Sequence, residues 1–163
     1  MKKIQLTRGK STLVDDSDFV WLNQWKWMAH NRNGKFYAAR GGYEKLGFYK
    51  YRIYTISMHR IIMDAIKGQE VDHINGDSLD NRRINLRLAN RFENNQNSSL
   101  RKDNTSGYKG VAFYKAGNKW IAYIGTGKKL RHIGYFTTAK EAARAYNQKA
   151  KELFGEFAKE NLL

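Results

Sequence analysis

Short runs of β-branched and aromatic residues, separated by Gly, Asn and Asp, dominate residues 1–57. Such runs between turn-forming residues are typical of β-strands. The run Phe19-Val20-Trp21-Leu22 fits either a short helix or a strand, because a short apolar run has no decisive period. We therefore predict a β-rich N-terminal region over residues 1–57. Its strands are expected at Ile4-Gln5-Leu6, Ser11–Val14, Phe36-Tyr37-Ala38 and Tyr49–Ser57.

Aromatic side chains are concentrated in the same region, where Trp21, Trp25 and Trp27 precede a group of tyrosines. Two interpretations are open, a platform on which bases stack and a hydrophobic core. We favour the core, because a small β-unit needs large apolar side chains to be stable. The tyrosines concerned are Tyr37, Tyr43, Tyr49, Tyr51 and Tyr54.

The pattern changes at Met58, and from there to Ile66 the apolar positions recur at helical spacing. A strand is expected over residues 71–74, and Asn75-Gly76 favours a tight hairpin turn into a second short strand. Farther on, Asn90 and Glu93 have the spacing of a capping box, which predicts a helix starting at Asn90. Two strands followed by a helix are thus expected in this central segment.

A polar stretch without periodicity follows, and we interpret residues 98–106 as a linker. Beyond it, short strand-like runs alternate with Gly-containing turns. The strands are expected over residues 108–115, 119–125 and 130–136.

One more helix is predicted near the C-terminus. Thr138 and Glu141 form a capping-box pattern, and the Ala-rich run after them should continue to Phe154 and stop at Gly155. Residues 107–163 are therefore expected to form a three-stranded antiparallel sheet packed on one helix. With the β-rich N-terminal region and the central segment, this makes the chain an α+β protein.

The charge of the chain changes the functional picture. The formal net charge is +15, and both halves of the chain are basic. A polyanion such as nucleic acid is the expected partner, because basic side chains that neutralise phosphates also release counterions. A charge that serves only solubility, or an acidic protein partner, would give the same composition. No apolar stretch has the length of a membrane span, so we expect no membrane partner.

The chain contains no cysteine. This excludes disulfide-linked partners and any cysteine-ligated zinc site, and it fits a reducing cytoplasm.

Four polar residues in the central segment suit phosphodiester hydrolysis. Asp72 and the side-chain carbonyl of Asn94 offer the oxygen ligands that Mg²⁺ or Mn²⁺ prefers, and we expect one divalent ion per site. His73 can take a proton from an attacking water, and Asn85 can hold the loop around it. The alternative interpretation of Asp72-His73 is a capped strand end with a surface histidine.

Residues 58–97 resemble the HNH homing endonucleases of phages and introns, in the variant whose last motif residue is Asn. The resemblance rests on MHR, DHINGD, DNR, NLR and ENN at consistent spacing. It implies that His73 is the general base, that Asp72 and Asn94 bind one divalent metal, and that Asn85 is the middle motif residue. His59 and Arg60, in the MHR stretch, are candidate DNA contacts, although a structural role for His59 is equally open.

Residues 107–161 resemble the ethylene-response-factor (apetala-type) DNA-binding domain of plants. The matching segments are YKGV, KWIA, IGYF, TAKEAARAY and FGEFA, with Asn161. The resemblance implies that the sheet enters the major groove while the helix braces its back. Where plant domains carry several arginines, this chain has Tyr123, Gly125 and Leu130, which weakens the case for direct guanine readout. The candidate DNA contacts in this domain are Lys109, Lys115, Tyr123, Lys128, Lys129, Arg131 and His132.

Together these patterns predict a metal-dependent HNH endonuclease of phage type. It would cut or nick double-stranded DNA as a monomer, in the cytoplasm of a bacterial host, positioned by its C-terminal domain. Two alternatives from other classes are a DNA-binding regulator that no longer cleaves and an RNA-binding module that uses the N-terminal aromatic residues.

Overall fold

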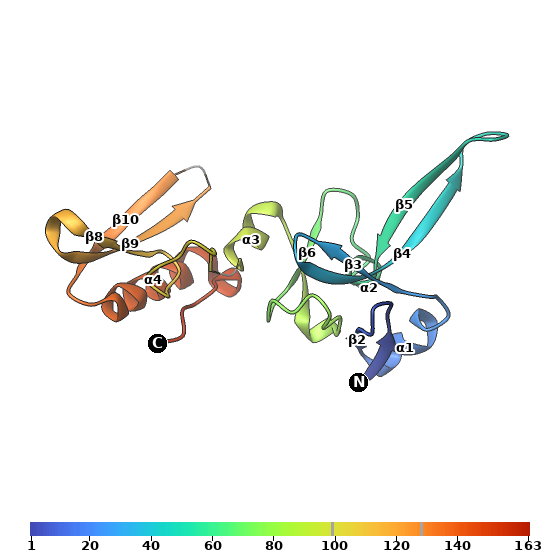
Figure 1. Cartoon of the computed structure of the whole chain (residues 1–163), viewed down its shortest axis with the longest axis horizontal. Coiled ribbons are helices and arrows are strands. Elements are labelled where there is room, and N and C mark those ends of the chain that lie inside the picture. Colours follow the sequence, from blue (N-terminus) through green and yellow to red (C-terminus); the bar gives the residue numbers. More distant parts are fainter. Residues whose placement is uncertain (99, 128) are drawn as a thin grey trace. The chain divides into compact units, whose positions relative to one another are not determined.

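The structure is a computed structural model that describes residues 1–98, 100–127 and 129–163 (Figure 1). It confirms the α+β class, since every multi-stranded sheet among the described residues is small and antiparallel. The chain divides into two compact units, Met1–Asn90 and Arg91–Leu163, which we describe separately. No helix of the described ranges is long and apolar enough to span a membrane.

The first unit contains three small sheets, two short helices and one 3-10 helix. The β1–β2 hairpin leads into α1, the meander β3-β4-β5 leads into α2, and β6 pairs with β7. The bounds are β1 Lys2–Gln5, β2 Ser11–Val14, α1 Asp16–Leu22, β3 Met28–Arg32, β4 Lys35–Lys45, β5 Tyr51–Ser57, α2 Met58–Ile62, β6 Glu70–His73, η1 Arg83–Asn85 and β7 Leu86–Ala89.

The structure settles the ambiguous apolar run in favour of a helix. Asp16 and Asp18 occupy the first turn of α1, where negative charge complements the helix dipole. Leu22 is fully buried at its end. The next helix, α2, is shorter than the expected run to Ile66. It ends at Ile62, because Asp64 adopts a left-handed backbone with a φ of +48° that cannot continue the helix. The Arg60 guanidinium binds the carbonyls of Ala65 and Ile66 in the turn that follows.

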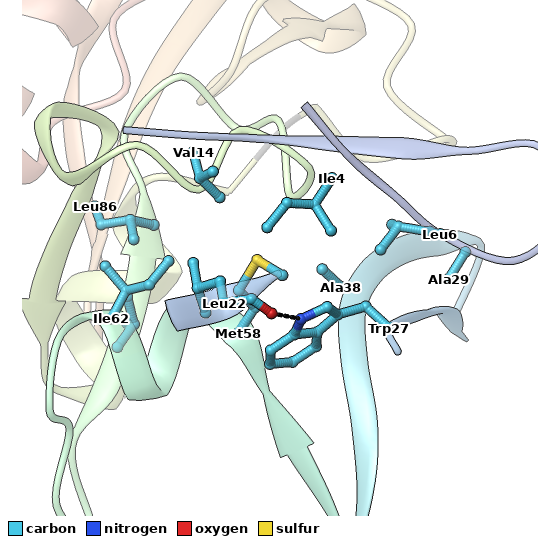
Figure 2. Packing of buried hydrophobic residues seen from close by; sticks show 11 residues of the cluster. Ile4, Leu6, Val14, Leu22, Trp27, Ala29, Ala38, Met58, Ile62 and Leu86 are labelled. Carbon is cyan, nitrogen blue, oxygen red and sulfur yellow. Dashed lines mark hydrogen bonds between the residues drawn. The ribbon is translucent and has the colours of Figure 1, made fainter. Parts of the chain in front are cut away.

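One hydrophobic core holds the first unit together (Figure 2). Ile4 and Val14 come from the N-terminal hairpin, while Met58 and Leu86 come from the central segment, and all of them pack in the same cluster. Trp27 is also buried there, and its indole N–H donates to the carbonyl of Leu22 at 2.8 Å. Residues 1–57 and the segment after them are therefore packed as one body.

Beyond β3, strands β4 and β5 continue as a two-stranded ribbon that projects from the unit (Figure 1). Its side chains are largely in solvent: Tyr43 is 77% exposed and Tyr49 is 89% exposed. The predicted core role is thus right for Trp27 but wrong for Trp25, Tyr43, Tyr49, Tyr51 and Tyr54. Tyr43, Tyr51 and Tyr54 lie where the sheet is only two strands wide, and Tyr49 lies in the turn between β4 and β5.

The connection between β6 and β7 also differs from the prediction. Gly76 adopts a φ of +80° and its N–H donates to the carbonyl of His73, so Asn75-Gly76 does form a turn. The tight hairpin is wrong, however, because the second strand begins only at Leu86. A loop over residues 74–85 fills the interval, and it contains most of the polar contacts described below.

The second unit agrees closely with the expected sheet and helix. The sheet has the order β10-β9-β8, and α4 packs on the face that carries Ala122 and Ile124. Thr138 and Glu141 make both hydrogen bonds of a capping box, and Gly155 follows the last residue of α4 with a φ of +53°. The bounds are α3 Arg91–Gln96, β8 Val111–Tyr114, η2 Lys115–Gly117, β9 Lys119–Thr126, β10 Lys129–Phe136, α4 Ala139–Phe154 and η3 Gly155–Phe157.

Candidate active site

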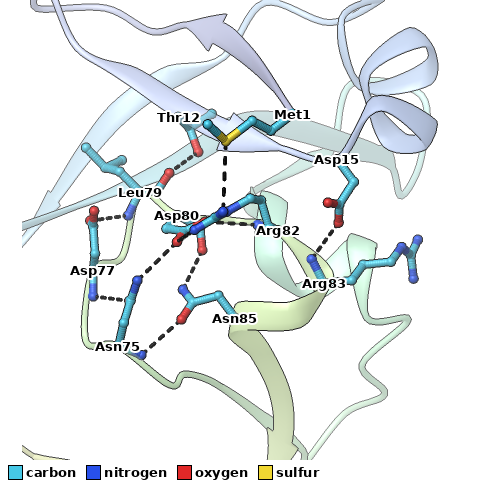
Figure 3. Close-up of polar contacts among 10 residues, drawn as sticks. All are labelled: Met1, Thr12, Asp15, Asn75, Asp77, Leu79, Asp80, Arg82, Arg83 and Asn85. Atoms are coloured by element: carbon cyan, nitrogen blue, oxygen red, sulfur yellow. Dashed lines mark hydrogen bonds and ion pairs between the residues drawn. The ribbon is translucent and has the colours of Figure 1, made fainter.

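The loop over residues 74–85 is held in shape by its own polar side chains (Figure 3). Asn85 bridges it, since its Oδ1 accepts from the Asn75 N–H at 2.9 Å and its Nδ2 donates to the Asp80 carbonyl at 2.8 Å. Asn75 in turn donates from Nδ2 to the Asp80 carboxylate at 3.0 Å. Asn85 thus has the loop-holding contacts that the sequence suggested, although its part in any reaction remains a prediction.

Two ion pairs anchor the end of this loop. Arg82 binds the carboxylate of Asp80 at 2.6 Å, and Arg83 binds that of Asp18, on α1, at 2.8 Å through Nε and Nη2. These hydrogen bonds hold the pKa of both carboxyl groups below the usual range, against a smaller opposing effect of burial. The loop is therefore fixed to the N-terminal helix as well as to itself.

Strand β2 packs against the loop and is hydrogen-bonded to it. The Leu13 N–H donates to the Leu79 carbonyl at 2.9 Å, and the Asn81 N–H donates to the Leu13 carbonyl at 2.8 Å. The hydroxyl of Thr12 adds a bond to the Leu79 carbonyl (Figure 3). An N-terminal strand is thus in direct contact with the loop that follows His73.

His73 lies at the end of β6 and is only 6% exposed. Its Nε2 is 3.1 Å from Oδ1 of Asn81. Burial lowers the pKa of His73, while the Asn81 hydrogen bond and the carboxylates of Asp72, Asp77 and Asp80 act in the opposite direction. The ring is therefore neutral at pH 7, which is the state required of a proton acceptor.

Two more rings pack against His73. The centroid of His59 is 5.1 Å away in an edge-to-face arrangement, and Tyr37 lies within 6.2 Å. His59 is itself largely buried, and its Nδ1 has no hydrogen-bond partner among the residues that the structure describes. Burial lowers its pKa from 6.5 to about 3, with a smaller contribution from His73. The structure thus places His59 inside the unit beside His73, and a DNA contact by His59 remains a prediction.

Arg60 was the other candidate DNA contact of the same stretch. Its guanidinium donates to the carbonyls of Ala65, Ile66 and Gln69, and these bonds close the turn between α2 and β6. The geometry gives Arg60 a structural task, and its contact with DNA remains a prediction.

Asp72 precedes His73 on β6, and the residue is 5% exposed. It pairs across the β6–β7 sheet with Arg87, whose Nε and Nη2 approach Oδ2 at 2.9 and 2.6 Å. Neighbouring residues of a strand point to opposite faces, so Asp72 and His73 leave β6 in different directions. This separation agrees with different roles for the two side chains.

A divalent metal has to be considered with these ligands. Within the described ranges, no group of three or more His, Cys, Asp or Glu side chains could hold an ion. Mg²⁺ does not need such a group, because it usually keeps several waters and binds one or two carboxylates together with substrate phosphates. The Asp72 carboxylate, which Arg87 binds, is the predicted ligand of this kind, and that role remains a prediction. Asn94 lies on α3 in the second unit, and its role as the other oxygen ligand remains a prediction.

The candidate DNA contacts of the second unit fall into two groups. Lys109 is engaged within the protein, since its ammonium donates to the carbonyls of Gln96 and Ser98 and burial lowers its pKa to about 8. Tyr123 and His132 are paired across β9 and β10, and His132 is exposed. Lys115, Lys129 and Arg131 are also exposed on turns and strands, while Lys128 lies outside the described residues.

Comparison with known proteins assigns the family. A family model described as HNH endonuclease matches residues 58–96, which include Asp72, His73, Asn85 and Asn94. The chain belongs to the HNH endonuclease family and is a DNA endonuclease, a hydrolase of phosphodiester bonds.

Two relatives support the assignment. The chain is 34% identical over 163 residues to an uncharacterized HNH endonuclease of Acanthamoeba polyphaga mimivirus, covering 96% of this chain and 78% of the relative. It is 34% identical over 93 residues to Protein 3.8 of Escherichia phage T7, covering 57% of this chain and 76% of that protein. No solved structure matches the chain.

Several residues of the site were not singled out from the sequence. Asn81 and Arg87 belong to the DNR and NLR segments of the motif, so their spacing from His73 could have indicated them. Thr12 had no such signal, because it lies in an ordinary strand far from the motif and reaches Asn81 only in the folded chain.

Proposed function

We propose that this chain hydrolyses phosphodiester bonds in double-stranded DNA, with His73 as the general base. The observation that carries the proposal is the state of His73: a buried, neutral imidazole whose Nε2 is fixed by Asn81. It also lies within the segment that matches the HNH endonuclease family. A histidine on an exposed strand end would have neither the burial nor the fixed ring.

In the proposed reaction, His73 takes the proton of a water that attacks the phosphorus atom. The bond from phosphorus to the 3′ oxygen breaks, and the leaving oxygen takes a proton from solvent. Asn85 keeps the loop in place through Asn75 and Asp80, so that the ring of His73 meets the phosphate in one orientation.

Asp72 and Asn94 are the proposed ligands of one Mg²⁺ or Mn²⁺ ion, which would stabilise negative charge developing on the phosphate and the leaving oxygen. Arg87, which faces Asp72 across the β6–β7 pair, holds the Asp72 carboxylate in place.

The second unit is proposed to position the enzyme on duplex DNA as an ethylene-response-factor type domain. Its support is a three-stranded sheet braced by α4, with basic side chains such as Lys115, Lys129 and Arg131 exposed. The charge of +15 gives the whole chain an affinity for phosphates. We expect a monomer on DNA that acts in the host cell, in keeping with the relative from phage T7.

The test is a cleavage assay on supercoiled plasmid with Mg²⁺, with EDTA as one control. His73→Ala should abolish relaxed and linear products while leaving duplex binding nearly unchanged. A matched control is His30→Ala, since His30 is an exposed histidine of the same unit, and this variant should cleave normally. Tight binding without any cleavage by the wild-type protein, with Mg²⁺ or Mn²⁺, would instead support a non-cleaving regulator.

A further inference from the structure

A series of hydrogen bonds between buried residues connects strand β2 with the ring of His73. The Thr12 hydroxyl donates to the Leu79 carbonyl at 2.7 Å, and Asn81 Nδ2 donates to the Thr12 hydroxyl oxygen at 2.7 Å. At the other end of the Asn81 amide, Oδ1 faces Nε2 of His73 at 3.1 Å. Thr12 is 1% exposed and Asn81 is 0% exposed, so water does not compete for these positions.

The chemistry of each group determines which partner donates and which accepts in every hydrogen bond of this series. A hydroxyl has one proton, and Thr12 gives it to the Leu79 carbonyl, which can only accept. The hydroxyl oxygen must then accept from Asn81, which turns the amide nitrogen toward Thr12 and the amide oxygen toward His73. An amide oxygen only accepts, so the proton of the neutral imidazole has to be on Nε2. Nδ1 is then the nitrogen without a proton.

We propose that Thr12 is a positioning residue that acts through Asn81 to hold His73 in its Nε2–H tautomer, so that Nδ1 receives the proton of the attacking water. The inference rests on the proposed role of His73 as general base. Thr12 belongs to the N-terminal hairpin, outside residues 58–96 that match the family. The hairpin would therefore contribute to the reaction as well as to the core.

The hydroxyl of Thr12 is not needed to attach β2 to the loop. The backbone bonds of Leu13 with Leu79 and Asn81 already do this, and Val14 is anchored in the core. Replacing the hydroxyl by a methyl group in Thr12→Val should leave these contacts in place. It removes the acceptor of the Asn81 amide nitrogen, so the amide can turn over and present a donor to Nε2. A donor at Nε2 favours the opposite tautomer, with the proton on Nδ1.

The first measurement is the tautomer of His73 from the ¹⁵N chemical shifts of its ring, at a pH where the ring is neutral. The wild-type protein and Thr12→Ser, which keeps a hydroxyl, should show Nε2–H. Thr12→Val should shift the population toward Nδ1–H. If Thr12→Val does not fold, Thr12→Ala takes its place, since the smaller side chain cannot clash. An unchanged Nε2–H tautomer in the variant without the hydroxyl would overturn the proposal.

Cleavage kinetics provide the second measurement. In Thr12→Val, kcat should fall about tenfold, less than the ~10²–10⁴-fold that a general base supplies, while KM stays within about twofold. Thr12→Ser should restore kcat. A loss in Thr12→Ser as large as in Thr12→Val would show that the hydroxyl is not the relevant group.

The proposed cleavage activity and the positioning role of Thr12 can be refuted separately. If the wild-type protein does not cleave DNA but the tautomer still follows the hydroxyl, the proposed function is wrong while the coupling of Thr12 to His73 stands. If the protein cleaves DNA normally and the tautomer of His73 does not change in the Thr12 variants, only the positioning role of Thr12 is wrong.

Discussion

His59 makes the stability of the first unit depend on pH in a predictable direction. Burial lowers the pKa of this histidine from 6.5 to about 3 in the folded protein. Below pH 6.5, His59 therefore binds a proton in the unfolded chain, whereas in the folded chain it stays neutral down to about pH 3. The stabilisation associated with neutral His59 is present above pH 6.5 and is lost progressively as the pH falls through that interval.

The size of the effect follows from the same pKa values. Each pH unit between the two pKa values lowers the free energy of unfolding by about 1.4 kcal/mol. Lowering the pH from 7 to 5 reaches about 1.5 units below the unfolded pKa, so His59 should remove about 2 kcal/mol from the free energy of unfolding. His73 and the carboxyl groups also titrate, and a variant that changes His59 alone separates its share from theirs.

The assay compares urea unfolding of the wild-type protein and His59→Phe at pH 7 and pH 5. Trp21, Trp25 and Trp27 lie in the first unit and report its unfolding by fluorescence, to which Trp120 of the second unit contributes equally in the wild-type protein and the variant. Phe keeps the ring contacts and removes the buried Nδ1 that has no described partner, so no loss is expected at pH 7. Between pH 7 and 5, the variant should lose about 2 kcal/mol less than the wild-type protein.

A matched control for this comparison is His30→Phe, which changes an exposed histidine of the same unit. If His59→Phe loses stability in parallel with the wild-type protein, the burial argument for His59 is refuted.

Two predictions concern the second unit, and both are read from thermal unfolding. Gly110→Ala should cost at least about 2 kcal/mol, because φ is +73° and the new Cβ would lie 2.2 Å from the Tyr146 ring. Gly107→Ala, at a φ of +75° with no atom within 4 Å, should cost only the backbone part, about 1 kcal/mol, and equal losses would contradict the contact argument. Thr138→Ala should cost about 1 kcal/mol by removing the acceptor of the Glu141 N–H, and unchanged stability would show that this cap is not needed.

Local signals made the C-terminal unit predictable. The capping box at Thr138 and the stop at Gly155 act within a few residues of sequence, and both are present at the expected places. Likewise, Ala122 and Ile124 alternate along β9 and both lie in the core, as the two-residue period of a strand requires of one face. Features of this kind need no knowledge of distant contacts.

The site was predictable only in part, for the opposite reason. Asp72 and His73 are neighbours in sequence, and a motif places them together. Thr12 approaches Asn81 because β2 packs under the loop, a contact across 69 residues that no local pattern encodes. The delayed start of β7 has a similar cause, since the Asn-Gly dipeptide marks a turn but cannot fix the strand that follows.

Aromatic composition was the weakest guide. A group of tyrosines and tryptophans predicts burial, but burial depends on how many strands lie beside them. Trp27 faces the common core, whereas Tyr43 and Tyr51 lie where only two strands are paired.

The projecting ribbon has a consequence for the solubility of the protein. From Arg40 onward β4 pairs only with β5, and β5 is the last strand of its sheet, so both edges of the ribbon expose backbone groups to solvent. Open edges next to exposed apolar side chains such as Ile53 are templates on which a second chain can add a strand. Lys45, Lys50 and Arg52 place like charges there, and two approaching ribbons repel each other. Salt screens that repulsion, so the ionic strength that weakens contact with phosphates also removes the protection against edge-to-edge aggregation.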